Sequence, residues 1–296
     1  MPDTLPHAMA SSNKLTRGIQ RGFAQIEEGQ VHFRHAGLEH AKSARALVMI
    51  HASPGSAKTL EPLMPTLAKR RWVIALDTLG NGDSCAPQTS HIDMAYLARA
   101  HLRALDDLGV DGFDLYGTHT GANIAAEMAI AQPQRVGHLI LDGVSLYSQA
   151  QRQEFLEHYA PDVVLDQGGS QFQFMWGFMR DAYLFWPWYA KSAAHLRNTG
   201  LPSAEVLHDK AVEVFKAART YPAIYRAALA YDKSTRLPLI KSKTLLCCAK
   251  TDMLFEYFDR VSALMPQAQT QVTQGISNAE HLQATRAMFE LFLEQT

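Results

Sequence analysis

The sequence predicts an α/β fold: a mostly parallel, twisted sheet flanked by helices, with an inserted helical cap. Short apolar runs alternate with helical patterns along most of the 296 residues, which is typical of a parallel sheet covered by helices. The alternation stops after Tyr147 and resumes near residue 237. We therefore expect a loosely ordered segment over 1–21, a core formed by 22–147 and 237–296, and a cap over 148–236.

Apolar runs and turn residues predict the elements of the first half. Glu28-Gly29 lies between two short segments and indicates an opening hairpin. The continuous apolar runs Ala46–Ile50 and Trp72–Leu76 are typical of strands buried on both faces. Asp93 can cap a helix whose apolar residues recur at helical spacing. Further strands are expected at 113–116 and 136–141, with a helix at 122–132 between them.

The cap region is helical in pattern and rich in aromatic residues, above all over 172–189. Trp176 and Trp186 are candidate substrate-binding residues, because an aromatic surface above the sheet can roof an apolar pocket. The alternative is that these rings only pack the cap against the core. Strands are expected again at 244–249 and 270–272, with helices at 255–264 and 281–293.

Composition limits the functional classes. A formal net charge of -1 gives no electrostatic footprint for nucleic acid or an anionic membrane, and no apolar run is long enough to cross a bilayer. The three cysteines fit neither a disulfide framework nor a zinc pattern, so we expect a cytoplasmic protein without a metal site. We expect no cofactor and a small-molecule substrate, and a homodimer is compatible with the sequence.

The segment Gly117-Thr118-His119-Thr120-Gly121 lies between an expected strand and an expected helix. It resembles the G-x-S-x-G nucleophile elbow of the α/β-hydrolase superfamily, with histidine where serine normally stands. The flanking glycines are needed because the central residue is strained and larger neighbours would collide with strand or helix.

Four further signatures, in the right order, carry the same resemblance to a capped α/β-hydrolase. His51-Ala52-Ser53-Pro54-Gly55 resembles the loop that supplies an oxyanion N–H, with alanine where glycine is usual. The stretch 77–87 resembles the glycine-rich turn of this superfamily. The strand that ends at Asp252 resembles the one that carries the acid of the catalytic triad. The resemblance implies an oxyanion hole formed by the N–H groups of Ala52 and Thr120.

The position of the base is ambiguous. The segment 275–283 resembles the loop that carries the base histidine in this superfamily, and Asn278 falls where that base is expected. A shift of three residues would instead make His281 the base but would spoil the agreement at Gly275 and Leu282. Asn278 is the preferred assignment.

These departures lead to one hypothesis. A histidine at 119 projects its imidazole toward the space that the base normally fills, and the shorter Asn278 would leave room for it. We expect a His119–Asp252 dyad that acts as general base, with Asn278 as a hydrogen-bond partner and Ser53 near the substrate.

Three function classes remain at this point. The first is an enzyme that acts on a small, mostly apolar ester, lactone or diketone. The second is a cofactor-independent lyase, isomerase or oxygenase on the same fold, and the third is a noncatalytic ligand-binding relative. A metal site formed by His51, His119, His281 and Asp252 is disfavoured, because no closely spaced ligand pair supports it.

Overall fold

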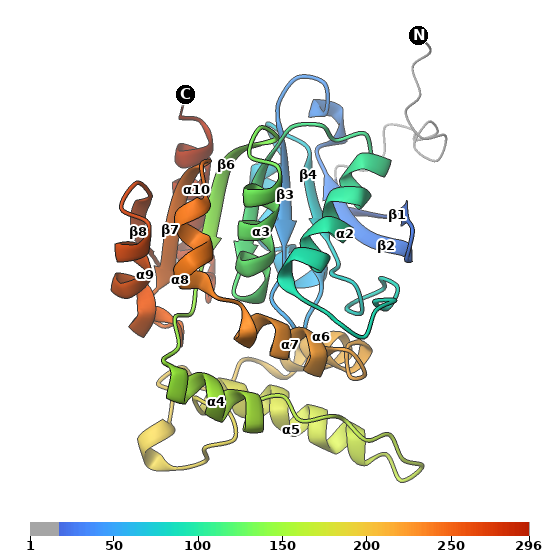
Figure 1. The fold of residues 1–296 in the computed structure, drawn as a ribbon, viewed down its shortest axis with the longest axis vertical. Helices are drawn as coiled ribbons and strands as arrows, with labels where there is room; N and C mark the ends of the chain where they lie inside the picture. The colour runs from blue at the N-terminus through green and yellow to red at the C-terminus, as the bar shows by residue number, and fades with distance from the viewer. Residues whose placement is uncertain (1–17, 296) are drawn as a thin grey trace.

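A computed structural model describes residues 18–295 and contains one eight-stranded sheet with the order β1-β2-β4-β3-β5-β6-β7-β8. The β1–β2 and β2–β4 pairs are antiparallel, and all other neighbours are parallel. The expected mostly parallel sheet is therefore confirmed (Figure 1). The strands are β1 Gln20–Ile26, β2 Gly29–Ala36, β3 Ala46–Ile50, β4 Val73–Leu76, β5 Phe113–Thr118, β6 Val136–Asp142, β7 Lys243–Ala249 and β8 Gln269–Thr273.

Helices cover both faces of the sheet because alternate residues of each buried strand point to opposite sides. On β3, Val48 and Ile50 pack in a core cluster with α2 (Met94–Asp107) and α3 (Thr120–Ala131). Leu47 and Met49 of the same strand pack in a second cluster with α1 (Met64–Leu67) and α10 (Ala279–Leu293). Strands buried on both faces require continuous apolar runs, which explains the sequence pattern of β3 and β4.

The helical insertion has a core of its own. In Figure 1 its helices α4–α7 lie beyond one end of the sheet. Aromatic contacts dominate this core: Trp188 packs edge-on against Phe178, and Phe178 stacks on Tyr221. Much of the aromatic content therefore serves packing inside the insertion. Its helices are α4 Gln149–His158, α5 Ser170–Leu184, α6 Ala204–Lys216 and α7 Tyr221–Ala230, and α8 Lys233–Arg236 leads back to β7.

The element boundaries differ from expectation in a few places. The opening hairpin starts at Gln20, so the last residues of the segment expected to be loosely ordered belong to β1, whereas 1–17 lie outside the described residues. The helix expected at 255–264 is divided into a 3₁₀ turn, Phe255–Tyr257, and α9, Phe258–Leu264. Within 18–295, none of the helices has both the length and the apolar content needed to traverse a bilayer.

Candidate active site

His119 sits in a sharp turn between β5 and α3. Its φ of 51° and ψ of -113° make it the one non-glycine residue within 18–295 with positive φ, and such a conformation is costly for a residue with a Cβ. A Cβ at Gly117 would lie 2.4 Å from the Gly121 carbonyl oxygen, and one at Gly121 would lie 2.3 Å from the Ile50 carbonyl oxygen. Both glycines are therefore needed for α3 to start this close to the sheet.

The imidazole of His119 is paired with the carboxylate of Asp252. The Nε2 atom lies 2.7 Å from Asp252 Oδ2, and the other carboxylate oxygen accepts the Leu254 N–H at 2.8 Å. Because Asp252 follows β7 at the same sheet edge, strand and turn bring the two side chains together.

The pairing with Asp252 assigns the tautomer of neutral His119. A charged carboxylate can only accept, so Nε2 carries the hydrogen and Nδ1 has the lone pair. No described residue hydrogen-bonds to Nδ1, and 28% of the His119 side chain is exposed. This leaves Nδ1 available as a base.

Gly143, which follows β6, makes room for the ring. A Cβ at this position would lie 2.7 Å from His119 Cδ2 and 2.8 Å from Nε2, and the φ of 67° also favours glycine. The backbone carbonyl of Asp142 accepts the His119 N–H at 3.0 Å. The segment 142–143 therefore fixes both the backbone and the imidazole of His119.

The charges around the dyad favour an ionised pair. Burial opposes an imidazolium at position 119, but the negative charges of Asp252 and Asp142 outweigh it, so the pKa of His119 is raised. Burial likewise opposes a charged Asp252, yet its bond to His119 leaves the pKa of that carboxyl lowered. Burial and the nearby charge of Asp252 raise the pKa of Asp142, which accepts the Tyr116 hydroxyl at 2.9 Å, to about 6.

A small cavity of about 40 Å³ lies between the start of α3 and the helical insertion. Its polar wall comes from the core, and an aromatic wall comes mainly from the insertion. A volume of this size holds only a few water molecules. The lining residues are His119, Thr120, Asn123, Ser145, Tyr147, Tyr159, Trp186, Tyr225, Ala228, Leu229, Met253 and Leu254.

Of the two residues expected to form an oxyanion hole, Thr120 is among the cavity-lining residues and Ala52 is not. Thr120 opens α3 and lines the cavity, and the first N–H groups of a helix have no partner within it. The Ala52 loop is braced by His51, whose Nδ1 donates to the Ala52 carbonyl at 2.8 Å while Nε2 accepts the Thr78 N–H at 3.0 Å. His51 thus has a structural function in positioning this loop.

Four predicted site residues lie apart from the dyad. Asn278 caps α10 by accepting the His281 N–H at 2.9 Å, and the His281 ring bonds to the Ser277 hydroxyl. Neither side chain is hydrogen-bonded to His119 or Asp252. The Ser53 hydroxyl is 3.3 Å from the Asn81 amide oxygen, and neither it nor Trp176 is among the cavity-lining residues, whereas Trp186 is.

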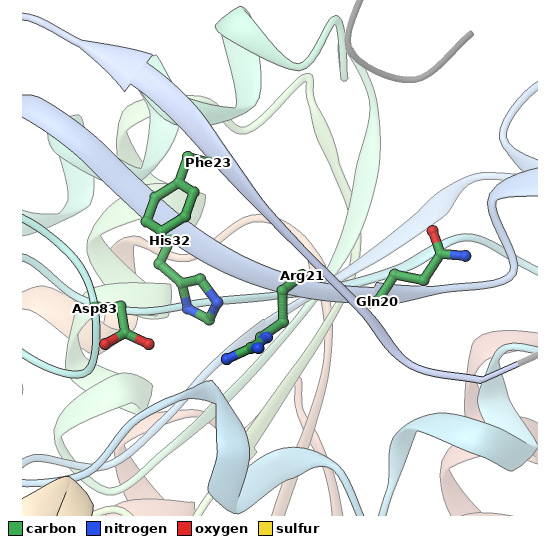
Figure 2. A pocket seen from close by; sticks show the side chains of 5 residues that line it. All are labelled: Gln20, Arg21, Phe23, His32 and Asp83. Atoms are coloured by element: carbon green, nitrogen blue, oxygen red, sulfur yellow. The ribbon is translucent and has the colours of Figure 1, made fainter. Parts of the chain in front are cut away.

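A wider hollow of about 690 Å³ at the sheet edge is lined by His32 and Asp83, among others (Figure 2), and His32 belongs to a second His–Asp pair. His32 Nδ1 is 2.8 Å from Asp77 Oδ2. His32, Asp77 and Asp83 form the one group with metal-ligand spacing found within 18–295. Asp77 is nevertheless held by the backbone N–H groups of Ala57 and Asp83, and Lys216 already pairs with Asp83 at 2.9 Å.

Sequence reasoning missed Gly143, Asp142 and Asn123. The only signal for Asn123 was its position in the first turn and a half of the helix that follows His119. No sequence signal indicated that Ser145 and Tyr147 line the cavity. The sequence of one strand does not show which of the residues after it lie beside the turn that follows a neighbouring strand.

Comparisons with known proteins agree with this architecture. The sequence model for the alpha/beta hydrolase fold matches residues 45–283. A 2-hydroxymuconate semialdehyde hydrolase from Pseudomonas sp. (strain CF600) is 39% identical over 100 residues, which cover 33% of this chain and 35% of that protein. A 2-hydroxy-6-oxononadienedioate/2-hydroxy-6-oxononatrienedioate hydrolase from Paraburkholderia xenovorans is 33% identical over 144 residues, 44% of this chain and 46% of that protein. The chain thus aligns with less than half of the length of these two relatives.

Solved structures share the fold over nearly the whole chain. A hydrolase from Pseudomonas aeruginosa superposes with a TM-score of 0.71 at 20% identity, covering 93% of this chain and 98% of that one. An enol-lactonase from Burkholderia xenovorans gives a TM-score of 0.70 at 18% identity and covers 93% of this chain and all (100%) of that one. At this identity the likeness concerns the fold alone. With the family model matching more than half of its residues, the chain belongs to the alpha/beta hydrolase fold family.

Proposed function

We propose that this protein is an α/β-hydrolase-fold enzyme in which a His119–Asp252 general-base dyad replaces the usual Ser-His-Asp arrangement. The substrate is a small, mostly apolar carbonyl compound such as an ester, lactone or diketone. The observation that carries the proposal is the 2.7 Å pairing of His119 Nε2 with Asp252, which leaves Nδ1 as a base beside the cavity.

Hydrolysis by this dyad needs no serine. Nδ1 of His119 takes a proton from a water molecule while the water oxygen forms a bond to the substrate carbonyl carbon. The N–H groups of Thr120 and Ala52 stabilise the resulting oxyanion, an effect of about 3–4 kcal/mol for one donor in a comparable site. When the tetrahedral intermediate collapses, the bond to the leaving group breaks and the imidazolium returns its proton to that group.

Asp252 has two functions in this scheme. It holds the ring in the Nε2–H tautomer, and its negative charge stabilises the imidazolium that forms during the reaction. In the usual triad the carboxylate contacts Nδ1 and Nε2 acts as the base. Here the two nitrogens exchange functions because the ring projects from the elbow.

The relatives support the substrate class. One is named a 2-hydroxymuconate semialdehyde hydrolase, another a 2-hydroxy-6-oxononadienedioate/2-hydroxy-6-oxononatrienedioate hydrolase, and one structural neighbour an enol-lactonase. The substrates in these names have a carbonyl group in common. For the present chain a carbonyl substrate is consistent with an apolar wall formed by residues such as Trp186, Leu229 and Met253.

Proton abstraction without hydrolysis is the second candidate. It is favoured by the same free Nδ1, which can remove an acidic C–H or O–H proton from a substrate, as a cofactor-independent lyase, isomerase or oxygenase requires. The third candidate, a noncatalytic binding protein, would explain the cavity but gives no reason for a strained His119 paired with a carboxylate.

Turnover of 4-nitrophenyl acetate, a small lactone and 2,4-pentanedione should be compared for wild type, His119→Ala and the control His281→Ala. We expect His119→Ala to lose activity by about 10²–10⁴-fold and His281→Ala to retain it. Equal activity of His119→Ala and wild type, or rapid labelling of Ser53 or Thr120 by a fluorophosphonate, would contradict the proposal. Exchange of substrate C–H protons without hydrolysis would favour the second candidate.

A further inference from the structure

Asn123 is a buried polar residue without a partner. It lies in α3, lines the cavity beside His119, and is only 4% exposed. No described residue donates a hydrogen bond to its side-chain amide or accepts one from it. Its amide atoms are not among the fully enclosed polar atoms that lack a partner within 18–295, so the amide is open to whatever occupies the cavity.

The local structure does not account for an asparagine at this position. The neighbours of Asn123 in α3 are mostly alanine, isoleucine and methionine, and asparagine forms helices less readily than these. An asparagine within a helix can bond back to a carbonyl one turn earlier, but that bond is not formed here. An apolar residue would suit both the helix and the wall better.

Several hydroxyl groups also line the cavity, those of Thr120, Ser145 and three tyrosines. A hydroxyl donates and accepts through one oxygen, whereas the Asn123 amide offers a donor and an acceptor on separate atoms. Asn123 and His119 both line the cavity, Asn123 from α3 and His119 from the turn before it. No lysine or arginine is among the described residues that line the cavity.

We propose that Asn123 is a specificity-determining residue that binds a second oxygen function of the substrate, a hydroxyl or a carbonyl distinct from the one attacked. The amide can donate from Nδ2 and accept at Oδ1, so it suits a neutral hydroxyl best. The substrate class narrows from simple esters and ketones to hydroxy-carbonyl and dicarbonyl compounds. This inference rests on the proposed function for the reacting carbonyl, but the binding preference itself requires no catalysis.

The test is a binding comparison of two small ligands of nearly equal shape, hydroxyacetone and 2-butanone, which differ by a hydroxyl in place of a methyl group. Dissociation constants from ligand titrations followed by protein NMR should favour hydroxyacetone by about three- to tenfold in wild type. Asn123→Leu, which keeps the branching of the side chain but has no polar atom, should abolish this preference. The matched control Tyr225→Phe removes a hydroxyl from another wall of the same cavity and should keep the preference.

Two outcomes would overturn the inference: a wild type that does not prefer hydroxyacetone, or an Asn123→Leu protein that still prefers it. If Asn123→Leu does not fold, Asn123→Ala should lose the preference in the same way. The same titration in a His119→Ala protein separates the two proposals. If the preference persists there while turnover proves independent of His119, the proposed function fails and the assignment of Asn123 stands.

Discussion

Two of the His–Asp pairs within 18–295 have nearly the same separation and very different surroundings. His119 and Asp252 are 2.7 Å apart, and His32 and Asp77 are 2.8 Å apart. The His119 side chain is 28% exposed and lines the cavity, whereas the His32 side chain is 2% exposed. The distance alone therefore does not distinguish a base from a structural pair; access to the second ring nitrogen does.

The two carboxylates differ in the same way. Asp77 is bound by His32 and by the N–H groups of Ala57 and Asp83, so it holds β2, the glycine-rich turn and the segment after β3 together. Asp252 accepts only from His119 and from the Leu254 N–H among the hydrogen bonds within 18–295. We infer a structural function for the first pair and a chemical one for the second.

The largest expected effect is on turnover at the elbow. His119→Ala should lower kcat by about 10²–10⁴-fold, because it removes the base, while the midpoint of thermal unfolding changes little. Steady-state kinetics and thermal denaturation of the same preparation test this. If His119→Ala unfolds at a lower temperature and its kcat falls only in proportion to the unfolded fraction, the His119–Asp252 pair is structural.

Gly143→Ala should separate ring position from ring chemistry. A Cβ here meets the imidazole at 2.7 Å, so the ring must move, and a displacement of this kind can cost about 10²-fold in rate. We expect a fall in kcat with an intact His119. Gly109→Ala is a matched control, since Gly109 also has positive φ but nothing within 4 Å of the added Cβ; a similar loss of kcat there would argue against displacement.

His32→Ala should have the opposite phenotype to His119→Ala. Removing the ring leaves part of the Asp77 carboxylate without its partner, so the free energy of unfolding should fall by about 1–3 kcal/mol. Below the unfolding transition kcat should remain near wild type. Denaturant titrations measure the first quantity, and a large loss of kcat in folded His32→Ala would remove the contrast between the pairs.

The smallest expected effect is a shift of the pH profile. The proposed base acts in its neutral form. Burial lowers the pKa of His119, but the charge of Asp252 raises it more, so the pKa lies above its ordinary value of 6.5. Activity should therefore increase with pH, with its midpoint above 6.5. In Asp252→Asn the raising charge is absent, so the midpoint should move to lower pH as the rate falls; an unchanged midpoint would show that another group titrates.

Linkage predicts an acid-dependent contribution to stability from both pairs, because the pKa values of Asp252 and Asp77 are both lowered, and a further contribution from His119. The raised pKa of His119 means that its pairing contributes stability fully below pH 6.5, which is lost as pH rises through the folded pKa. The pKa of Asp77 is lowered below 3.8, so its contribution is present above that value and is lost as pH falls through the folded pKa.

Much of the fold could be predicted from the sequence because its signals are local. Continuous apolar runs identified β3 and β4, and Asp93 was confirmed as the N-cap of α2. Both elbow glycines are explained by close backbone contacts. Boundaries shifted where local signals compete, as at Asn278, which starts α10 two residues earlier than the apolar pattern indicated.

The site was less predictable, because it depends on contacts between distant segments. The resemblance to α/β-hydrolases indicated Asp252. The space that Gly143 leaves for the His119 ring, in contrast, depends on the register of β6 against β5 and β7. Asn278 has a local capping function that outweighs its position in the aligned loop. For Asn123, only the finished cavity shows that a helical amide is left without a partner.

The most direct measurement of the central claim is the tautomer of His119 in solution. Proteins labelled with ¹⁵N in histidine, wild type and His119→Gln, would allow its two ring nitrogens to be assigned and titrated by NMR. The account predicts that neutral His119 carries its hydrogen on Nε2, has an unprotonated Nδ1, and titrates above pH 6.5. A hydrogen on Nδ1, or a titration unaffected by Asp252→Asn, would contradict it.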